Sequence, residues 1–401
     1  MKHVFVADGV RTPIGNLRGA LSAVRTDDLA ALVLQQLVAR YPNMPTEVID
    51  EVIMGCANQA GEDNRNIARM ASLLAGISYT VPGETVNRLC ASGMSAVIQA
   101  ARAIQVGDAN LCIAGGVEHM TRGPWVISKT SAAFGQDAQM YDSTFGWRFV
   151  NPLMHQMYGT DAMGVTAENV AEMYNINRED QDKFAYRSQM KAKAAQAAGT
   201  LAEEIVGVSI AGKKGAVTIV DQDEFIKPTT TLDILGKLKA SFKKDGTVTA
   251  GNASGLNDGA AALFVASEEA IKQHGLVPKA RIISSAVVGV EPRIMGIGPV
   301  GATQKALAKA GLTLKDIDII ELNEAFAAQS LACMRLLGLH DDDPRVNPNG
   351  GAIALGHPLG MSGTRIINAA AMELQRRGKR YAVATMCIGL GQGYAVVLER
   401  V

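Results

Sequence analysis

The chain has 401 residues with 39 basic and 39 acidic side chains, so its formal charge is zero and no charged surface for nucleic acid or a membrane is expected. Hydrophobic residues make up 48% and aromatic residues 5%, with 41 glycines, a composition typical of an α/β enzyme with closely packed aliphatic cores. The length allows two or three domains.

Helical and strand-like segments alternate along the N-terminal part. Apolar residues at helical spacing predict a helix over 27–40, and 96–105 has the same periodicity. Short apolar runs at 52–54 and 111–114 indicate buried strands. This order predicts layered α/β structure with parallel strand pairing.

The C-terminal third repeats the theme. The expected strands are 317–321, 381–387 and 393–398, and the expected helices are 324–337 and 363–377. A Gly-Met-Ser tripeptide precedes a helix in both parts, at 93–95 and 360–362, which suggests duplication. Two similar halves would then face each other across one site. Residues 120 to about 250 break the pattern and are interpreted as an inserted, lid-like loop domain.

The cysteines favour a reducing compartment. Their number is odd and no two have C-x-x-C spacing, which disfavours a disulfide framework and a zinc site; they are Cys56, Cys90, Cys112, Cys333 and Cys387. Residues 1–15 enter a strand pattern at once, without room for a signal peptide, and no apolar run approaches the ~20 residues that span a bilayer. We expect a cytoplasmic protein that binds no metal and no membrane.

The most informative segment is the run NRLCASGMS at 87–95, which contains Cys90. A helical pattern follows, so the thiol is expected at a helix N-terminus, where free amides and the positive dipole end favour a thiolate. The small residues after it would let a substrate carbonyl approach backbone N–H groups, as an acyl-transfer nucleophile requires. On this segment alone, a buried structural cysteine is an equally good interpretation.

Two further clusters contain residues capable of acid-base chemistry. His357 follows a glycine-rich loop and precedes Pro358, which disfavours a helical conformation at the histidine and places it at a loop tip facing a helix start. Cys387 ends an apolar strand before Gly389, in a turn where a thiol could be exposed and backbone amides could point inward. A structural histidine and a buried strand-end cysteine remain alternatives. Acyl transfer to a thiol needs this combination of nucleophile, base, second acid or base and oxyanion donors.

These clusters resemble the motifs of the thiolases, or acetyl-CoA acyltransferases, and the resemblance extends over essentially the whole chain. The matching segments are 87–90, 321–326, 347–358 and 387–393, with further matches at 115–120, 163–169 and 248–259. The resemblance implies a five-layered αβαβα fold. Residues 1–270 would form the N-terminal half, with the loop domain at about 120–250 inserted, and 271–401 the C-terminal half. It also implies a homo-oligomer, either a dimer or a tetramer.

The resemblance also implies roles for individual residues. Cys90 would accept the acyl group and His357 would activate it, whereas Cys387 would protonate or deprotonate the α-carbon of acetyl-CoA. Asn323 would hold a water that forms one oxyanion hole with His357. The backbone N–H groups of Cys90 and Gly389 would form the other.

Coenzyme A would be a substrate, with no permanently bound cofactor. Ser254 matches the family's pantetheine-contacting serine, and Met163 begins a matching motif and is expected near CoA. Lys227 stands where relatives often have an arginine close to the adenine nucleotide, but lysine cannot form the arginine fork. No nucleotide-binding glycine motif occurs between a strand and a helix.

Several stretches resemble the thiolases of aromatic-compound degradation that cleave 3-oxoadipyl-CoA into succinyl-CoA and acetyl-CoA. They are 56–66, 145–154, 347–351 and 360–362. The segment DAMGV at 161–165 departs from the DSMPE of many relatives, and Ala162 is smaller than the histidine of acetoacetyl-CoA thiolases. A terminal carboxylate would need a cation or several donors, for which Arg148 and His155 are candidates.

Other activities stay open at this point. An acetyl-CoA acetyltransferase or a general 3-ketoacyl-CoA thiolase of fatty-acid degradation would use the same chemistry. A ketoacyl synthase would have two histidines beside the cysteine, where this chain has a second cysteine. A non-catalytic thiolase-like protein that binds CoA or lipid should have lost at least one of the four key side chains, and all are present.

Overall fold

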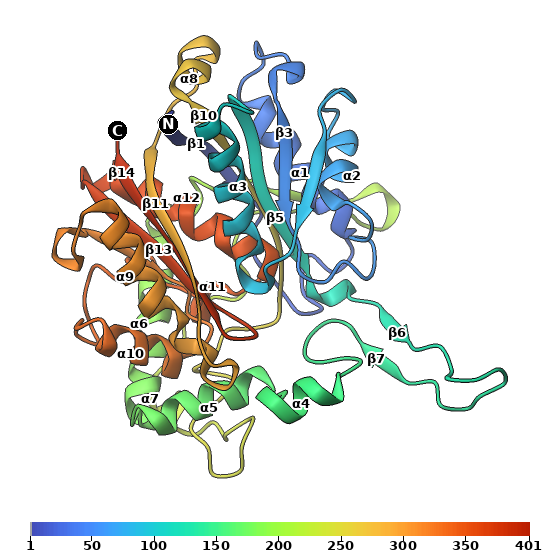
Figure 1. Cartoon of the computed structure of the whole chain (residues 1–401), viewed down its shortest axis with the longest axis vertical. Coiled ribbons are helices and arrows are strands. Elements are labelled where there is room, and N and C mark those ends of the chain that lie inside the picture. Colours follow the sequence, from blue (N-terminus) through green and yellow to red (C-terminus); the bar gives the residue numbers. More distant parts are fainter. Residues whose placement is uncertain (1) are drawn as a thin grey trace.

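The computed structural model describes residues 2–401. Within them, ten strands form one mixed sheet in the order β12-β13-β14-β11-β1-β10-β5-β3-β4, with β2 paired to β10 (Figure 1). The strands are β1 (Val4–Arg11), β2 (Gly15–Asn16), β3 (Glu51–Gly55), β4 (Gly83–Val86), β5 (Leu111–His119), β10 (Asn257–Ser267), β11 (Ala280–Gly289), β12 (Ile319–Leu322), β13 (Tyr381–Ile388) and β14 (Gln392–Arg400).

The predicted parallel pairing is correct for only part of the sheet. β3 pairs in parallel with β4 and β5, and β12 with β13, but the other pairs are antiparallel. Only a short turn separates β13 from β14, and strands joined by a tight hairpin must run antiparallel. β1 and β11 connect the two groups of strands through the pairs Phe5↔Arg281 and Val6↔Ala280.

The helices and strands form five layers, as expected for the thiolase fold. Helices α1 (Thr26–Ala39) and α2 (Ile67–Leu74) cover the outer face of the N-terminal strands. α9 (Gly298–Ala310) and α10 (Ala327–Leu336) cover the outer face of the C-terminal strands. Between the two groups of strands lie α3 (Ser92–Val106) and α12 (Leu359–Arg377), whose apolar residues pack with both (Figure 1).

The two Gly-Met-Ser tripeptides meet in the central layer. Gly93 lies in the first turn of α3, and a Cβ there would come within 2.5 Å of the Gly360 carbonyl oxygen at the start of α12. Only glycine therefore allows this approach. The close packing brings the N-termini of the two central helices together.

Residues between β5 and β10 lie outside the main sheet. They contain the hairpins β6 (Trp125–Ile127) with β7 (Met140–Asp142) and β8 (Val208–Ala211) with β9 (Val217–Val220), and the helices α4 (Pro152–Tyr158), α5 (Met163–Met173), α6 (Arg178–Ala197) and α7 (Leu232–Gly236). The β6–β7 hairpin projects from the body as an arm (Figure 1). The short helices α8 (Glu268–His274) and α11 (Ala352–Leu355) complete the fold. Across residues 2–401, no helix combines the length and hydropathy needed to cross a membrane.

Candidate active site

Cys90 lies in a tight elbow between β4 and α3. It is the middle residue of a 3-10 turn, Leu89–Ala91, and α3 begins at Ser92. Leu89 has a φ of 48°, a strained value for a residue with a side chain. The hydroxyl of Ser92 donates to the Leu89 carbonyl at 2.7 Å and accepts from the Arg88 amide at 2.9 Å. These bonds fix the elbow that presents the thiol at the predicted helix start.

The surroundings of Cys90 favour the protonated thiol. Burial raises its pKa to about 11, although hydrogen bonds from the backbone N–H groups of Gly389 and Cys90 itself act in the opposite direction. The expectation that the helix start favours a thiolate is therefore wrong for the resting state, because loss of solvation outweighs the helix amides. A base must remove the proton when the sulfur attacks.

His357 is held as a neutral imidazole with a defined tautomer. Its ring Nδ1 lies 2.7 Å from the Ser362 hydroxyl, which itself donates to the Pro358 carbonyl at 2.8 Å. Since a hydroxyl has one proton, Ser362 must accept from Nδ1–H, and Nε2 carries the free lone pair. Burial and the nearby Arg365 lower the pKa of His357 to about 3. The residue lies in the short link between α11 and α12, directly before a helix start as predicted, and its side chain is buried.

Asn323 faces the free nitrogen of His357. Its amide Nδ2 lies 3.4 Å from His357 Nε2, and its backbone N–H donates to the Thr385 carbonyl at 3.0 Å. Within residues 2–401 its buried Oδ1 has no hydrogen-bond partner. The site thus contains a polar group with capacity for a small polar molecule or a substrate oxygen.

Cys387 is completely buried in β13, so its expected exposure in a flexible turn is wrong. Burial raises the pKa of the Cys387 thiol well above its usual range, and negative charge on Cys90 or Cys333 would raise it further. Two residues later, the β13–β14 turn begins at Gly389, whose Cβ, if present, would lie 3.2 Å from Leu89 Cδ1. The turn therefore packs directly on the elbow and brings its amide to the Cys90 sulfur.

Two cavities meet at Cys90. One, of about 240 Å³, contains His357, Ser254 and Phe326. The other, of about 220 Å³, contains Gly389, Arg148 and Trp147. Four residues line both: Cys90, Phe145, Met163 and Leu359. The thiol thus stands where a thioester in one cavity would join an acyl chain in the other.

The residues expected at CoA separate into two groups. Ser254 and Met163 line the cavity of His357, and the Ser254 amide donates to the Ala325 carbonyl at 2.9 Å. Lys227 is exposed and does not line it; its Nζ lies 4.9 Å from the centre of the Phe225 ring, which approaches Gly255. Lys227 therefore lies near the loop that contains Ser254 and Gly255.

The two candidates for a carboxylate contact also differ in position. Arg148 and Ala162 line the cavity of Gly389. His155 is exposed on α4, where its Nδ1 lies 2.7 Å from the Thr160 hydroxyl, and it lines neither cavity. The geometry therefore favours Arg148 over His155.

Sequence reasoning missed the roles of Ser362 and Glu118. Both lie in segments that it had singled out, the second Gly-Met-Ser tripeptide and the run 115–120. Glu118 lines the cavity of Arg148, and its carboxylate accepts from the amides of Ala57, Asn58 and Gly360 at 2.9–3.0 Å. It thereby ties the loop after β3 to the start of α12.

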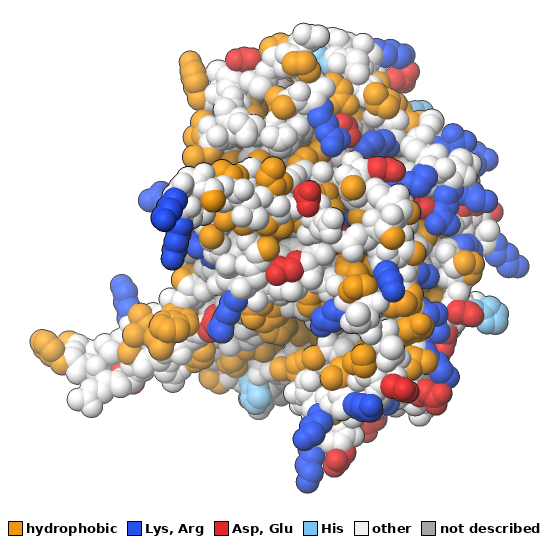
Figure 2. All heavy atoms as spheres, turned by 180° about the vertical axis from the view of Figure 1, so that it is seen from behind, with side chains coloured by type: hydrophobic (Ala, Val, Ile, Leu, Met, Phe, Trp, Pro, Cys, Tyr) orange, Lys and Arg blue, Asp and Glu red, His pale blue; other side chains and the backbone are white. Residues whose placement is uncertain are grey.

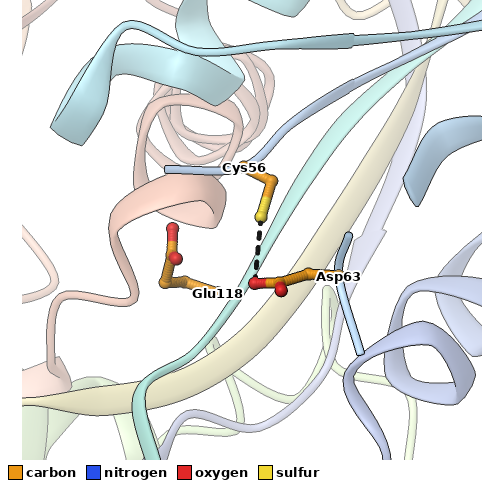
Figure 3. Close-up of side chains that lie close together, drawn as sticks. All are labelled: Cys56, Asp63 and Glu118. Carbon is orange, nitrogen blue, oxygen red and sulfur yellow. Dashed lines mark hydrogen bonds between the residues drawn. The ribbon is translucent and has the colours of Figure 1, made fainter. Parts of the chain in front are cut away.

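Glu118 also belongs to a group of potential metal ligands with Cys56 and Asp63 (Figure 3). Their ligand atoms lie within 4.8 Å of one another. Asp63 already accepts from the Cys56 thiol at 3.5 Å and from the Gly61 amide at 2.8 Å. Burial raises the pKa of the Cys56 thiol well above its usual range, so this sulfur is a hydrogen-bond donor. The group is a buried network that orders a loop.

Comparisons with known proteins agree with the geometry. The model of the thiolase N-terminal domain matches residues 4–269, and that of the thiolase C-terminal domain matches 276–400. The chain is 61% identical to the 3-oxoadipyl-CoA/3-oxo-5,6-dehydrosuberyl-CoA thiolase of Escherichia coli K12, with both chains fully covered. Two crystal structures match all of the chain and 99% of their own: Bacillus anthracis acetyl-CoA acetyltransferase (TM-score 0.92, 41% identity) and human mitochondrial 3-ketoacyl-CoA thiolase (0.90, 42%).

Proposed function

Since the chain belongs to the thiolase family, we propose that it cleaves 3-oxoadipyl-CoA with coenzyme A to give succinyl-CoA and acetyl-CoA. The observation that carries the chemistry is the position of Cys90, where two cavities meet beside a neutral imidazole and the Gly389 amide. The similarity to the E. coli enzyme supports the substrate. Both substrates in that enzyme's name end in a carboxylate.

The first half-reaction forms an acyl-cysteine. His357 Nε2 takes the proton of Cys90, and the sulfur attacks the 3-oxo carbon of the substrate. The backbone N–H groups of Cys90 and Gly389 stabilise the oxyanion that forms on this carbon. The bond to the α-carbon then breaks, and the Cys387 thiol donates its proton to that carbon. The products are acetyl-CoA and a succinyl thioester on Cys90.

Charge also develops on the thioester oxygen of the leaving acetyl-CoA. Protonated His357 and a water held by Asn323 stabilise it, in agreement with the free polar capacity of the Asn323 amide. Protonation at the α-carbon removes the charge. In this mechanism the two oxyanions lie on opposite sides of the Cys90 sulfur, one at the Gly389 amide and the other at His357.

The second half-reaction restores the enzyme. Coenzyme A enters the cavity lined by Ser254 and Met163, and its thiol gives a proton to Cys387. The resulting thiolate attacks the succinyl carbonyl, Cys90 leaves and takes back the proton from His357, and succinyl-CoA departs. Cys90, His357 and Cys387 thus recover their starting protonation states, because the coenzyme A proton replaces the one that Cys387 gave to acetyl-CoA. The cycle uses no permanently bound cofactor. Lys227, which lies near the loop that contains Ser254, is the residue proposed to contact the CoA nucleotide.

The proposal includes a cytoplasmic homo-oligomer. The β6–β7 arm exposes four large apolar side chains, and Figure 2 shows hydrophobic side chains along it; they are Trp125, Ile127, Phe134 and Met140. Exposed apolar residues on a projecting arm are typical of an association surface. Light scattering coupled to size-exclusion chromatography should give the mass of a dimer or tetramer, and a monomer would refute this part.

The activity is tested by incubating the enzyme with 3-oxoadipyl-CoA and coenzyme A and separating the products. Succinyl-CoA and acetyl-CoA should appear in equal amounts. Neutral 3-oxohexanoyl-CoA, with the same number of acyl carbons, is the comparison substrate. A kcat/KM for the neutral substrate equal to or above that for the diacid would point instead to a general 3-ketoacyl-CoA thiolase.

A further inference from the structure

The cavity on the Gly389 side of Cys90 combines an apolar wall with a positive charge. Its apolar residues include Leu89, Trp147, Ala162 and Leu390, and among the described residues of its lining Arg148 provides the cation. The acyl chain that remains on Cys90 must extend away from the thioester cavity. Arg148 therefore lines the cavity into which the acyl chain on Cys90 would extend.

The guanidinium of Arg148 is held by neutral acceptors. One Nη donates to the Ser143 carbonyl at 3.3 Å, and the other donates to Asn58 Oδ1 at 3.4 Å. No ion pair between residues 2–401 includes Arg148, although other arginines, such as Arg122, bind carboxylates. Both contacts are long, and an arginine has five N–H donors, so donors remain free for an anion.

The acidic residue of the same cavity, Glu118, forms no ion pair with this guanidinium, and burial raises the pKa of its carboxyl group to about 7. Both oxygens of Glu118 accept backbone amides, from Asn58 on one oxygen and from Ala57 and Gly360 on the other. Asn58 thus contacts the two side chains through different atoms. Its backbone N–H donates to the Glu118 carboxylate, and its side-chain oxygen accepts from the Arg148 guanidinium. These hydrogen bonds position the Arg148 guanidinium, and they hold the Glu118 carboxylate against backbone N–H groups.

We propose that Arg148 binds the terminal carboxylate of the acyl chain and thereby selects 3-oxo diacid thioesters over neutral ones; this inference rests on the proposed function. The half-buried guanidinium of Arg148 has donors left free, and a carboxylate matches its fork in a bidentate contact. The carboxylate of a succinyl group lies at the end opposite the thioester. Asn58 and Ser143 are positioning residues for this contact.

The test compares the ratio of kcat/KM for 3-oxoadipyl-CoA to that for 3-oxohexanoyl-CoA in the wild type and in Arg148→Gln. Because a charged hydrogen bond is worth enough to change a rate about tenfold or more, the ratio should fall by about that factor. Arg148→Lys keeps the charge without the fork and should give an intermediate ratio. Arg102→Gln, at an exposed arginine of α3, is the matched control and should keep the wild-type ratio.

The outcomes separate the inference from the proposed function. A wild type without preference for the diacid overturns the proposed substrate and the inference with it. A wild type that prefers the diacid, with the same ratio in Arg148→Gln, overturns the inference alone. If Arg148→Gln does not fold, the same comparison is made with Arg148→Lys, where an unchanged ratio overturns the inference. The rate of Cys90 acylation measures the same preference directly: succinyl-CoA should acylate Cys90 of the wild type faster than butanoyl-CoA does.

Discussion

Removing the hydroxyl of Ser362 tests how His357 acts as a base. In Ser362→Ala the Nδ1–H of a buried imidazole loses its acceptor at 2.7 Å, and leaving a buried donor unsatisfied costs about 1–3 kcal/mol. The imidazole can escape part of this cost by moving its proton to Nε2, which removes the lone pair that faces Asn323. At about 1.4 kcal/mol per tenfold change in rate, kcat should fall by roughly 5-fold to 150-fold.

The assay combines steady-state kinetics with 15N NMR of protein labelled in its histidine rings. In the wild type, the His357 imidazole should be neutral and protonated at Nδ1. In Ser362→Ala, His357 should show a mixture of tautomers or the other tautomer. Ser362→Thr keeps a hydroxyl and should recover most of the activity, with thermal unfolding as a check on packing. An unchanged kcat with an unchanged tautomer in Ser362→Ala would refute the role of this hydrogen bond.

Two other predictions follow from buried ionisable groups. Cys387→Ala should lose about 10²-fold or more of its turnover but still exchange acyl groups between Cys90 and acyl-CoA, whereas an exchange rate as low as that of Cys90→Ala would contradict the separate roles. Burial raises the pKa of Glu321 to about 8, although an Arg365 nitrogen lies 3.8 Å from its carboxylate. Between pH 4.5 and 8 the folded state therefore keeps a proton that the unfolded state releases. Because of this difference, the stability of the folded state falls as pH rises. In Glu321→Gln the unfolding temperature relative to wild type should therefore rise from pH 5 to 8, and a constant difference would contradict the assignment.

Local patterns were sufficient to locate most elements of the sheet and the central helices. The helix expected at 363–377 is α12, which begins earlier, at Leu359. The helix expected from 324 begins at Ala327, because the residues before it make contacts outside a helix. Asn323 donates through its backbone to Thr385, and Ala253 forms a bridge with Phe326. Such partners are distant in sequence and leave no periodic signal.

The site was predicted in composition but not in its electrostatics. The motif predicted Cys90 at a helix start because the small residues after it and the helical periodicity are local. Its pKa, by contrast, depends on burial and on the Gly389 amide, which belongs to another half of the sheet. The tautomer of His357 likewise depends on the Ser362 hydroxyl. This contact forms only because α12 begins directly after His357 and turns Ser362 back toward the imidazole. The predicted domain boundaries and catalytic roles stay predictions.

The chemical identity of the enzyme intermediate tests the proposed role of Cys90 without reference to rates. The enzyme is mixed with 3-oxoadipyl-CoA in the absence of added coenzyme A, quenched in acid and digested, and the peptides are analysed by mass spectrometry. We expect a succinyl group on Cys90, absent in Cys90→Ala, with acetyl-CoA released in equal amount. A label on Cys387 or elsewhere, or an active preparation with no acylated peptide, would contradict it.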